Sequence, residues 1–333
     1  MTKCLIIGSG IVGLTTAYEL NKTGHQVTII DNQSTGQASK SAAGIMFPLN
    51  PWKNTKYMQD LCISGHEQYN NFFNTLSIED KKEINFEKKN LLIFGNDIES
   101  AKNWYDEKPA INSSYIKGNL NSREKFIKGS HKDFLEIKNI NILDPRKLIN
   151  FLRKALFKNN VEFKNSKIEK LDSFLRKPLN NKYEFIILCA GVWSNHILGN
   201  KNIRLKPIKG QLLHFKTREK LIDNVLLYNN YYIIPRRDNR IVVGATIEDV
   251  GFDENTTSSA KIFLEKSVSE IFSCSVEMLS LEQTYGFRPY SDKEDPYINI
   301  DIKNERLIYN FGHYRYGILT AISSAKIVKK LIS

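Results

Sequence analysis

The chain has 333 residues, of which 41% are hydrophobic and 25% charged, and 48 Lys+Arg against 36 Asp+Glu leave a formal net charge of +12. This composition is typical of a soluble globular protein with room for two domains or one large α/β unit. The lysines are scattered without a tight basic run, which argues against a nucleic-acid groove. We therefore expect no nucleic-acid partner.

The four cysteines, Cys4, Cys62, Cys189 and Cys274, are widely separated, form no CxxC pair and have no histidine at metal-ligand spacing. This pattern predicts neither a zinc site nor a disulfide framework, and it fits a reducing cytoplasm. Glycines interrupt the N-terminal MTKCLIIGSG, unlike a signal peptide, and no apolar run reaches the length of a membrane span. We expect a cytoplasmic protein with no membrane span and no bound metal.

The first 31 residues predict a strand, a glycine turn, a helix and a second strand. LIIG is a short apolar strand, and the following IVGLTTAYELNKTG has apolar residues near helical spacing before it stops at Gly24. HQVTIID then predicts the second strand. This order is the first unit of a doubly wound parallel sheet.

Gly8, Gly10 and Gly13 form GxGxxG between the predicted strand and helix, and Asp31 stands at the end of the second strand. Together these features make the dinucleotide-binding fingerprint. Gly8 permits the turn, Gly10 lets the backbone approach a pyrophosphate, and Gly13 allows close packing of helix on strand. Asp31 would accept hydrogen bonds from ribose hydroxyls and disfavours a 2′-phosphate. The cofactor is therefore NAD or FAD.

The segment GQASKSAAGIMFP, Gly36–Pro48, consists mostly of small residues and follows Asp31 closely. Bulky side chains would collide with an extended cofactor running beside this segment. Small residues here favour FAD over NAD, although such stretches also occur in plain surface loops.

The middle of the chain gives fewer signals. Residues 53–83 are predicted to be helical and 91–94 to form a strand, whereas 95–145 is polar and predicts no definite element. A helix (RKLINFLRKALF) follows Pro145. The very apolar YEFIILCAGVWS, residues 183–194, then predicts a central parallel strand that returns to the first domain.

The last part of the chain changes character. Residues 207–250 contain short β-rich stretches with a turn at Asp238 and Asn239, which predicts an antiparallel sheet. A helix at 258–272, the strand pair YINID and RLIYNFG, and a closing helix at 317–331 follow. The whole predicts an α/β fold with a Rossmann-like doubly wound domain and an α+β second domain built on a mixed or antiparallel sheet.

Several motifs in this order resemble the D-amino-acid oxidase family of FAD enzymes, and within it the glycine oxidases of the thiamine-biosynthesis type. They are GSGIVG with Asp31, SKSAAGIMFPLNPW, PIKGQ, YYIIPRRDNRIVVGAT, GFRP and FGHYRYGI. The resemblance covers nearly the whole chain except 95–145. Tyr314 and Tyr316 depart from it, since the family more often has Phe and Asn at these two positions, which puts a strict preference for glycine in doubt.

The resemblance implies the glutathione-reductase-like fold of that family, in which a discontinuous FAD domain packs on a substrate domain. The FAD domain would comprise residues 1–84, 144–206 and 286–333. The substrate domain would comprise residues 85–143 and 207–285.

The resemblance also implies the residues of the site. Non-covalent FAD would contact Gly8, Gly10, Ile11, Val12 and Gly13 at the pyrophosphate, Asp31 and Asn32 at the ribose, Ala38, Ser39, Ala43, Gly44 and Ile45 near the flavin, Ile168 at the adenine, and His313, Tyr314, Arg315, Tyr316, Gly317, Ile318 and Leu319 at the isoalloxazine. The substrate would contact Arg288, Arg315 and Tyr232.

Amino-acid chemistry supports these substrate residues. A planar guanidinium that forks onto a carboxylate orients the substrate Cα–H better than a lysine does. Arg288 precedes Pro289, which favours an extended backbone at Arg288, and Tyr232 can donate a phenolic hydrogen bond to the same carboxylate. The flavin carries the redox step, so no catalytic side-chain base is required, and His313 is not expected to be one.

We therefore expect oxidative deamination of glycine or a small amino acid or amine. A hydride passes from Cα to flavin N5, an imine forms, and O2 is reduced to H2O2; the glycine imine would suit thiamine thiazole synthesis. Three alternatives stay open: a D-amino-acid dehydrogenase that reduces a quinone, a tRNA-modifying oxidase acting on carboxymethylaminomethyl uridine, and a non-catalytic flavin-binding protein. A homo-oligomer is also compatible with the sequence.

Overall fold

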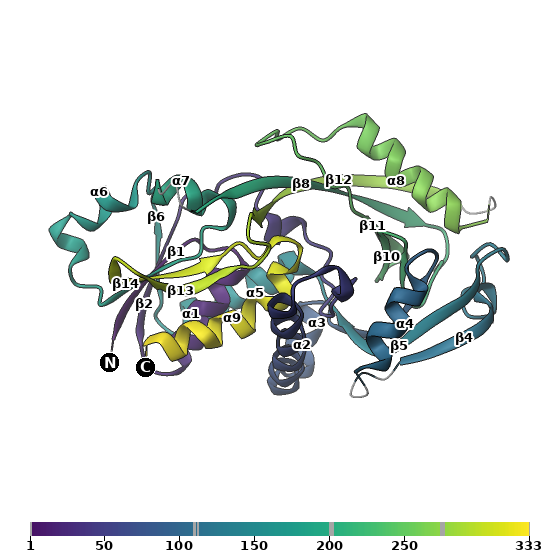
Figure 1. The fold of residues 1–333 in the computed structure, drawn as a ribbon, viewed down its shortest axis with the longest axis horizontal. Helices are drawn as coiled ribbons and strands as arrows, with labels where there is room; N and C mark the ends of the chain where they lie inside the picture. Colours follow the sequence, from purple (N-terminus) through teal and green to yellow (C-terminus); the bar gives the residue numbers. More distant parts are fainter. Residues whose placement is uncertain (1, 109–110, 112, 200–202, 274–276, 333) are drawn as a thin grey trace.

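The computed structural model describes residues 2–108, 111, 113–199, 203–273 and 277–332. Within them the chain builds two β-sheets at opposite ends of an elongated molecule (Figure 1). The long strands β8 (Leu205–Thr217) and β12 (Met278–Ser291) extend from the first sheet toward the second. Both termini lie close together beside the first sheet.

The first sheet has the strand order β13-β14-β7-β1-β2-β6. Its strands are β1 (Lys3–Ile7), β2 (Gln26–Asp31), β6 (Glu162–Asn165), β7 (Phe185–Leu188), β13 (Tyr297–Asp301) and β14 (Asn304–Phe311). All neighbours are parallel except β13 and β14. β1 and β7 are apolar along almost their whole length because helices and loops cover both faces of a parallel sheet. The predicted doubly wound sheet is confirmed.

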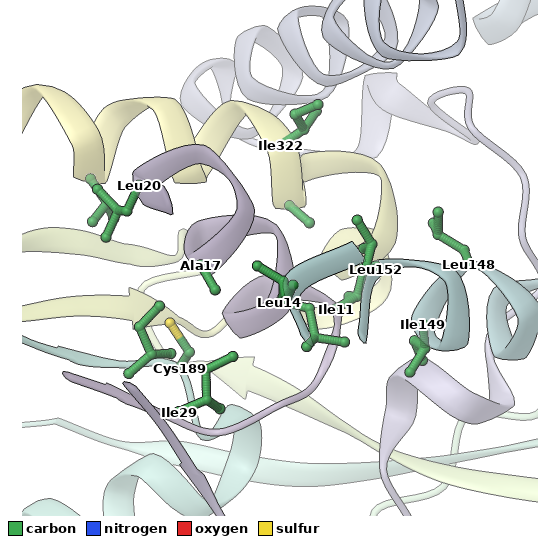
Figure 2. Packing of buried hydrophobic residues seen from close by; sticks show 14 of the residues in the cluster. Ile11, Leu14, Ala17, Leu20, Ile29, Leu148, Ile149, Leu152, Cys189 and Ile322 are labelled. Atoms are coloured by element: carbon green, nitrogen blue, oxygen red, sulfur yellow. The ribbon is translucent and has the colours of Figure 1, made fainter. Parts of the chain in front are cut away.

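Three helices share one hydrophobic core on this sheet: α1 (Ile11–Lys22), α5 (Pro145–Lys158) and α9 (Gly317–Ile332). Figure 2 shows Leu14 and Ala17 of α1 beside Ile29 of β2, with Leu152 of α5 and Ile322 of α9 closing the cluster. Both α1 and α9 are buried on more than one face, as the unbroken run of buried residues 318–325 in α9 shows. The helix α2 (Lys56–Thr75) packs against α9.

The second sheet has the order β12-β8-β11-β10-β9-β3-β5-β4. Its further strands are β3 (Glu87–Phe94), β4 (Ser113–Asn119), β5 (Lys132–Ile142), β9 (Val225–Tyr228), β10 (Tyr231–Arg236) and β11 (Arg240–Gly244). Only β3 and β9 are parallel among the described pairs, so the expected mixed sheet is confirmed. Asp238 and Asn239 both have positive φ, which makes the predicted tight turn between β10 and β11. The helix α8 (Ser258–Ile271) covers the outer face (Figure 1).

Two regions differ from the sequence-based expectation. Residues 53–83 form two helices, α2 and α3 (Ile78–Glu83), because Ser77 and Asp80 make a capping box that starts a new helix. Residues 95–145 contain α4 (Ile98–Asp106), β4 and β5. β4 is an edge strand without a fully buried residue, so its sequence lacks the apolar alternation that predicts a strand.

The remaining short elements are α6 (Leu171–Leu175), α7 (Ser194–Leu198) and the 3-10 helices at Ala38–Ser41, Pro51–Lys53, Leu120–Ser122, Pro178–Asn180, Gly191–Trp193 and Tyr314–Tyr316. Among the described helices, none combines the length and apolar character of a membrane span. Cys4, Cys62 and Cys189 are buried and unpaired, while Cys274 lies outside the described residues. The division into two domains stays a prediction, and its boundary at residue 286 falls inside β12.

Candidate active site

A large cavity joins the two sheets. The space between its walls, including the mouth open to solvent, amounts to about 1830 Å³. The β1–α1 turn, the segment after β2, the segment after β7, and parts of β8, β10 and β12 form the walls, together with the turn before α9. A cavity this long suits a dinucleotide with a substrate beside it.

Every predicted site residue except Gly13 lines this cavity. They are Gly8, Gly10, Ile11, Val12, Asp31, Asn32, Ala38, Ser39, Ala43, Gly44, Ile45, Ile168, Tyr232, Arg288, His313, Tyr314, Arg315, Tyr316, Gly317, Ile318 and Leu319. The structure therefore brings together residues from distant parts of the chain. Their individual roles stay predictions.

The β1–α1 turn has the shape that the glycine motif requires. Gly8 has φ +106°, and a Cβ on it would lie 2.5 Å from the carbonyl oxygen of Cys189. A Cβ on Gly13 would lie 2.0 Å from the carbonyl oxygen of Gly8, so Gly13 acts through packing rather than by facing the cavity. Any larger residue at either position would push α1 away from the sheet.

The amino end of α1 faces the cavity. The backbone N–H of Ile11 donates a hydrogen bond to the Ser39 hydroxyl at 3.1 Å, and a Cβ on Gly10 would lie 3.3 Å from the same oxygen. An acceptor oxygen thus already stands at the helix terminus, where a phosphate oxygen binds in dinucleotide sites. At the rim, Asp31 accepts from the backbone N–H groups of Ser9 and Gln33, both at 2.5 Å, which fixes its carboxylate beside the turn. These features fit a dinucleotide cofactor.

At the far end of the cavity Arg288 is held between two strands. Its Nη1 donates to the Thr246 carbonyl oxygen at 2.9 Å, and its guanidinium lies over Gly210 of β8. Burial lowers the pKa of Arg288, and the positive charge of Arg315 lowers it further. Arginine keeps its charge under such conditions because its ordinary pKa is above 12. Arg288 is therefore a fixed cation in the cavity wall.

Tyr232 is 7% exposed and lies close enough to Arg288, Arg315 and Arg236 for all three charges to act on it. Burial raises the pKa of the Tyr232 phenol, and the three arginines partly offset this rise. The phenol is neutral at physiological pH and remains a hydrogen-bond donor. A Cβ on Gly244 would lie 2.6 Å from the Tyr232 ring, so the neighbouring strand leaves room for the ring.

Arg315 lies beside Arg288 and makes no hydrogen bond or ion pair with any residue that the structure describes. Within the same described part of the chain, neither arginine forms an ion pair with Asp292 or Glu305; the ion pairs of arginine lie elsewhere, for example between Arg146 and Glu282. Both guanidiniums are partly exposed to the cavity, and two neighbouring cations that form no ion pair attract an anionic ligand. With Tyr232, they present three hydrogen-bond donor side chains to the same cavity.

His313 is 2% exposed and fixed on both ring nitrogens. Nδ1 lies 2.9 Å from the Thr320 hydroxyl and Nε2 lies 3.0 Å from Oδ1 of Asn310. Burial lowers the pKa of His313 to about 3. The ring is neutral at physiological pH and its nitrogens are already bonded, which agrees with the expectation that it is not a catalytic base.

Sequence reasoning missed two residues that shape the site. Gly210 provides the space that Arg288 occupies, and Arg236 donates a hydrogen bond to the carbonyl oxygen of Ala43 in the cavity wall. Gly210 had a signal, because a glycine inside a strand often marks the close approach of another group. Arg236 follows the YIIP motif directly but carries no signal of its own.

A loop after β11 reaches toward the mouth of the cavity. The ring of Phe252 lies 5.2 Å from that of Phe287 and 6.0 Å from that of Trp193, and both of these residues line the cavity. The fully buried Lys209 holds the loop from beneath, donating to Asp253 at 2.7 Å and to the Asn255 carbonyl oxygen at 2.5 Å. The loop thus packs against two residues of the cavity wall.

A protein-family model described as FAD dependent oxidoreductase matches residues 3–331. The chain belongs to this family. The expected family and its FAD cofactor are thereby confirmed, and FAD rather than NAD is the dinucleotide.

Among curated proteins, the chain is 26% identical to a glycine oxidase of Pseudomonas putida over 99% of this chain and 94% of that protein. It is 28% identical to the bifunctional protein ThiO/ThiG of a Nostoc species. That match covers 98% of this chain and 52%, about half, of the Nostoc protein. Most aligned residues differ between this chain and each of these two relatives.

Solved structures agree on the fold. Glycine oxidase from Bacillus cereus superposes with a TM-score of 0.85 at 21% identity, covering 100% of this chain and 95% of that one. Iminodiacetate oxidase from a Chelativorans species gives 0.84 at 21% identity, covering 99% and 95%. The expected fold is confirmed.

Proposed function

We propose that this flavoenzyme oxidises the C–N bond of glycine or another small amino acid or amine, with O2 as the electron acceptor. The observation that carries the proposal is the pair of arginines, Arg288 and Arg315, which line the same cavity as the dinucleotide turn and form no ion pair with any described residue. The glycine oxidase relatives support the same substrate class.

The wall residues suit FAD from end to end. The α1 terminus near Gly10 would hold the pyrophosphate, Asp31 the ribose, and the small residues Ala43 and Gly44 the flavin, with Gly317 at the start of α9 beside it. When bound, FAD supplies the two-electron acceptor that the reaction needs. The amino end of α9 would favour negative charge on the reduced ring.

The chain itself binds and orients the substrate. The guanidiniums of Arg288 and Arg315 would bind the carboxylate, and the Tyr232 hydroxyl would donate to it. Thr246 holds Arg288 through its carbonyl oxygen, so the carboxylate would be bound in one orientation with Cα toward the interior of the cavity. No described side chain is needed as a base, because the amino acid can react as its neutral amine.

A finer proposal concerns the product. Hydrolysis of an imine would give a 2-oxo acid and ammonia, whereas direct transfer would deliver glycine imine to thiazole synthesis. The ThiO/ThiG relatives support the second fate.

The electron acceptor has its own test. Production of H2O2 under air would support O2 as the acceptor, and its absence together with quinone reduction would favour the dehydrogenase alternative.

In the decisive experiment, the purified flavoprotein is mixed without oxygen with glycine, sarcosine, D-alanine or D-proline. The flavin absorbance is recorded to detect reduction of the cofactor. We expect bleaching by at least one of them. A cofactor that stays oxidised with all four contradicts the proposal and favours the non-catalytic alternative. Steeply salt-dependent tRNA retention would instead favour the tRNA-modifying alternative.

A further inference from the structure

Tyr316 ties the turn before α9 to a separate wall of the cavity. Its side chain is 9% exposed and packs with Met58, Cys62 and Leu319. Its hydroxyl donates to the Leu49 carbonyl oxygen at 2.8 Å and accepts from Nδ2 of Asn54 at 2.9 Å. One phenol therefore binds both ends of the segment from Leu49 to Asn54.

The same segment is held from its outer side. Nε2 of Gln59 donates to the Asn54 carbonyl oxygen at 3.0 Å, and Nε1 of Trp104 donates to Oε1 of Gln59 at 2.8 Å. Lys53 forms an ion pair with Asp97 at 2.9 Å. These contacts anchor the segment to α2 and to the region of α4, whereas Tyr316 is its anchor toward the flavin end.

The segment matters because its first residue, Leu49, lines the cavity that also contains Arg288, Arg315 and Tyr232. Leu49 and the preceding Phe47 both line the cavity and belong to the apolar cluster that contains Tyr232. Tyr316 follows Arg315 directly in sequence. The space for substituents on the substrate is therefore bounded by residues whose position depends on the Tyr316 hydroxyl.

We propose that Tyr316 is a specificity-determining residue, which fixes the segment Leu49–Asn54 against the cavity and so limits the substrate to small substituents on Cα and nitrogen. This inference rests on the proposed function. A phenol suits the task because its rigid ring places one hydroxyl between a carbonyl acceptor and an amide donor. Tyr316 acts through Leu49 and does not need to touch the reacting atoms.

The test compares Tyr316→Phe with the wild type, using glycine and D-norvaline as a small and a larger substrate. Removing the hydroxyl should change the ratio of the two kcat/KM values by about 10-fold in favour of D-norvaline, since an apolar pocket discriminates a few methylenes by about this much. Equal losses for both substrates, or an unchanged ratio, would overturn the proposal.

Tyr69→Phe is the matched control. Tyr69 is 1% exposed on α2, does not line the cavity, and its hydroxyl has no hydrogen-bond partner among the described groups. This variant should keep the wild-type ratio. Asn54→Ala removes the other partner of the Tyr316 hydroxyl and should shift the ratio in the same direction as Tyr316→Phe.

Hydrogen exchange separates the two proposals. Backbone amides in residues 49–54 should exchange faster in Tyr316→Phe than in the wild type and in Tyr69→Phe. If no amine reduces the wild-type flavin, the proposed function fails, and the exchange result still decides whether Tyr316 fixes the segment. Unchanged exchange in this segment would overturn the structural basis of the inference.

Discussion

The guanidinium of Arg288 lies directly over the backbone of Gly210. A methyl group on Gly210 would stand 2.1 Å from Nη2 and 2.2 Å from Cζ of Arg288. The two residues belong to the paired strands β12 and β8, and Thr246 fixes the guanidinium from the other side through its carbonyl oxygen. The position of the Arg288 guanidinium is therefore set by a glycine on a neighbouring strand.

Gly210→Ala should displace Arg288 and leave the dinucleotide turn intact. We expect KM for the amino acid to rise at least about 10-fold, since even a small misplacement of a positioning group is costly, while the ratio of FAD to protein stays as in the wild type. Gly129→Ala serves as the control, because Gly129 has ordinary backbone geometry away from the cavity. A wild-type KM in Gly210→Ala would contradict the assigned role of Arg288.

Arg288→Ala should weaken the binding of carboxylate substrates by about 2–5 kcal/mol, since it removes one partner of a desolvated charge pair. Arg288→Lys should restore part of the affinity, because lysine keeps the charge but not the forked geometry. Substrate affinity can be measured by anaerobic flavin titration. The control Arg218→Ala removes an arginine whose side chain is 85% exposed, and it should leave the substrate affinity unchanged. A wild-type affinity in Arg288→Ala would refute the proposed substrate site.

His313 should make the folded protein less stable in acid. Its folded pKa is about 3, whereas the unfolded pKa is close to 6.5. Between these values the unfolded state binds a proton that the folded state does not, so stability falls as pH drops from about 6.5 toward 3, by up to about 1.4 kcal/mol per pH unit. His313→Gln should flatten this slope in urea unfolding measured from pH 7 to 4. An unaltered slope would mean that His313 does not remain neutral in the fold.

Lys209→Met should loosen the loop that reaches toward the cavity mouth. The ammonium is fully buried and holds Asp253, whose pKa its hydrogen bond lowers to about 2. We expect faster proteolysis within residues 249–256 and faster FAD loss on dilution. The control is Lys206→Met. Lys206 lies on the same strand as Lys209 and forms a solvent-exposed ion pair with Asp249 of the loop. Equal effects from both variants would show that burial of the ammonium is not what holds the loop.

The sequence alone predicts the part of the fold that depends on local patterns. The β1–α1–β2 unit carries glycines whose spacing has a geometric reason, and α9 is mostly apolar and closes the chain's core. The strand β4 has no such pattern, because it is an edge strand that pairs only with β5. In β5 the four successive residues 134–137 are buried, so this strand lacks the period of two that predicts a half-buried strand.

The site is predictable to a similar extent. The identities of Arg288 and Arg315 follow from motif resemblance, whereas their lack of an anionic partner depends on where Asp292 and Glu305 end up in space. The contact between Gly210 and Arg288 and the link from Tyr316 to Leu49 join residues far apart in the chain. Neither of these two contacts corresponds to a periodic pattern in the sequence.

The first sheet takes β1 from the beginning of the chain and β14 from near its end, and α1 packs on α9. During synthesis the ribosome therefore releases the dinucleotide turn long before Arg315 and Gly317. Until those residues emerge, β7 lacks its neighbour β14 and the apolar face of α1 is uncovered. Before α9 is made, the nascent chain exposes apolar surface that favours aggregation, and its dinucleotide cavity is complete only after Gly317 has been synthesised.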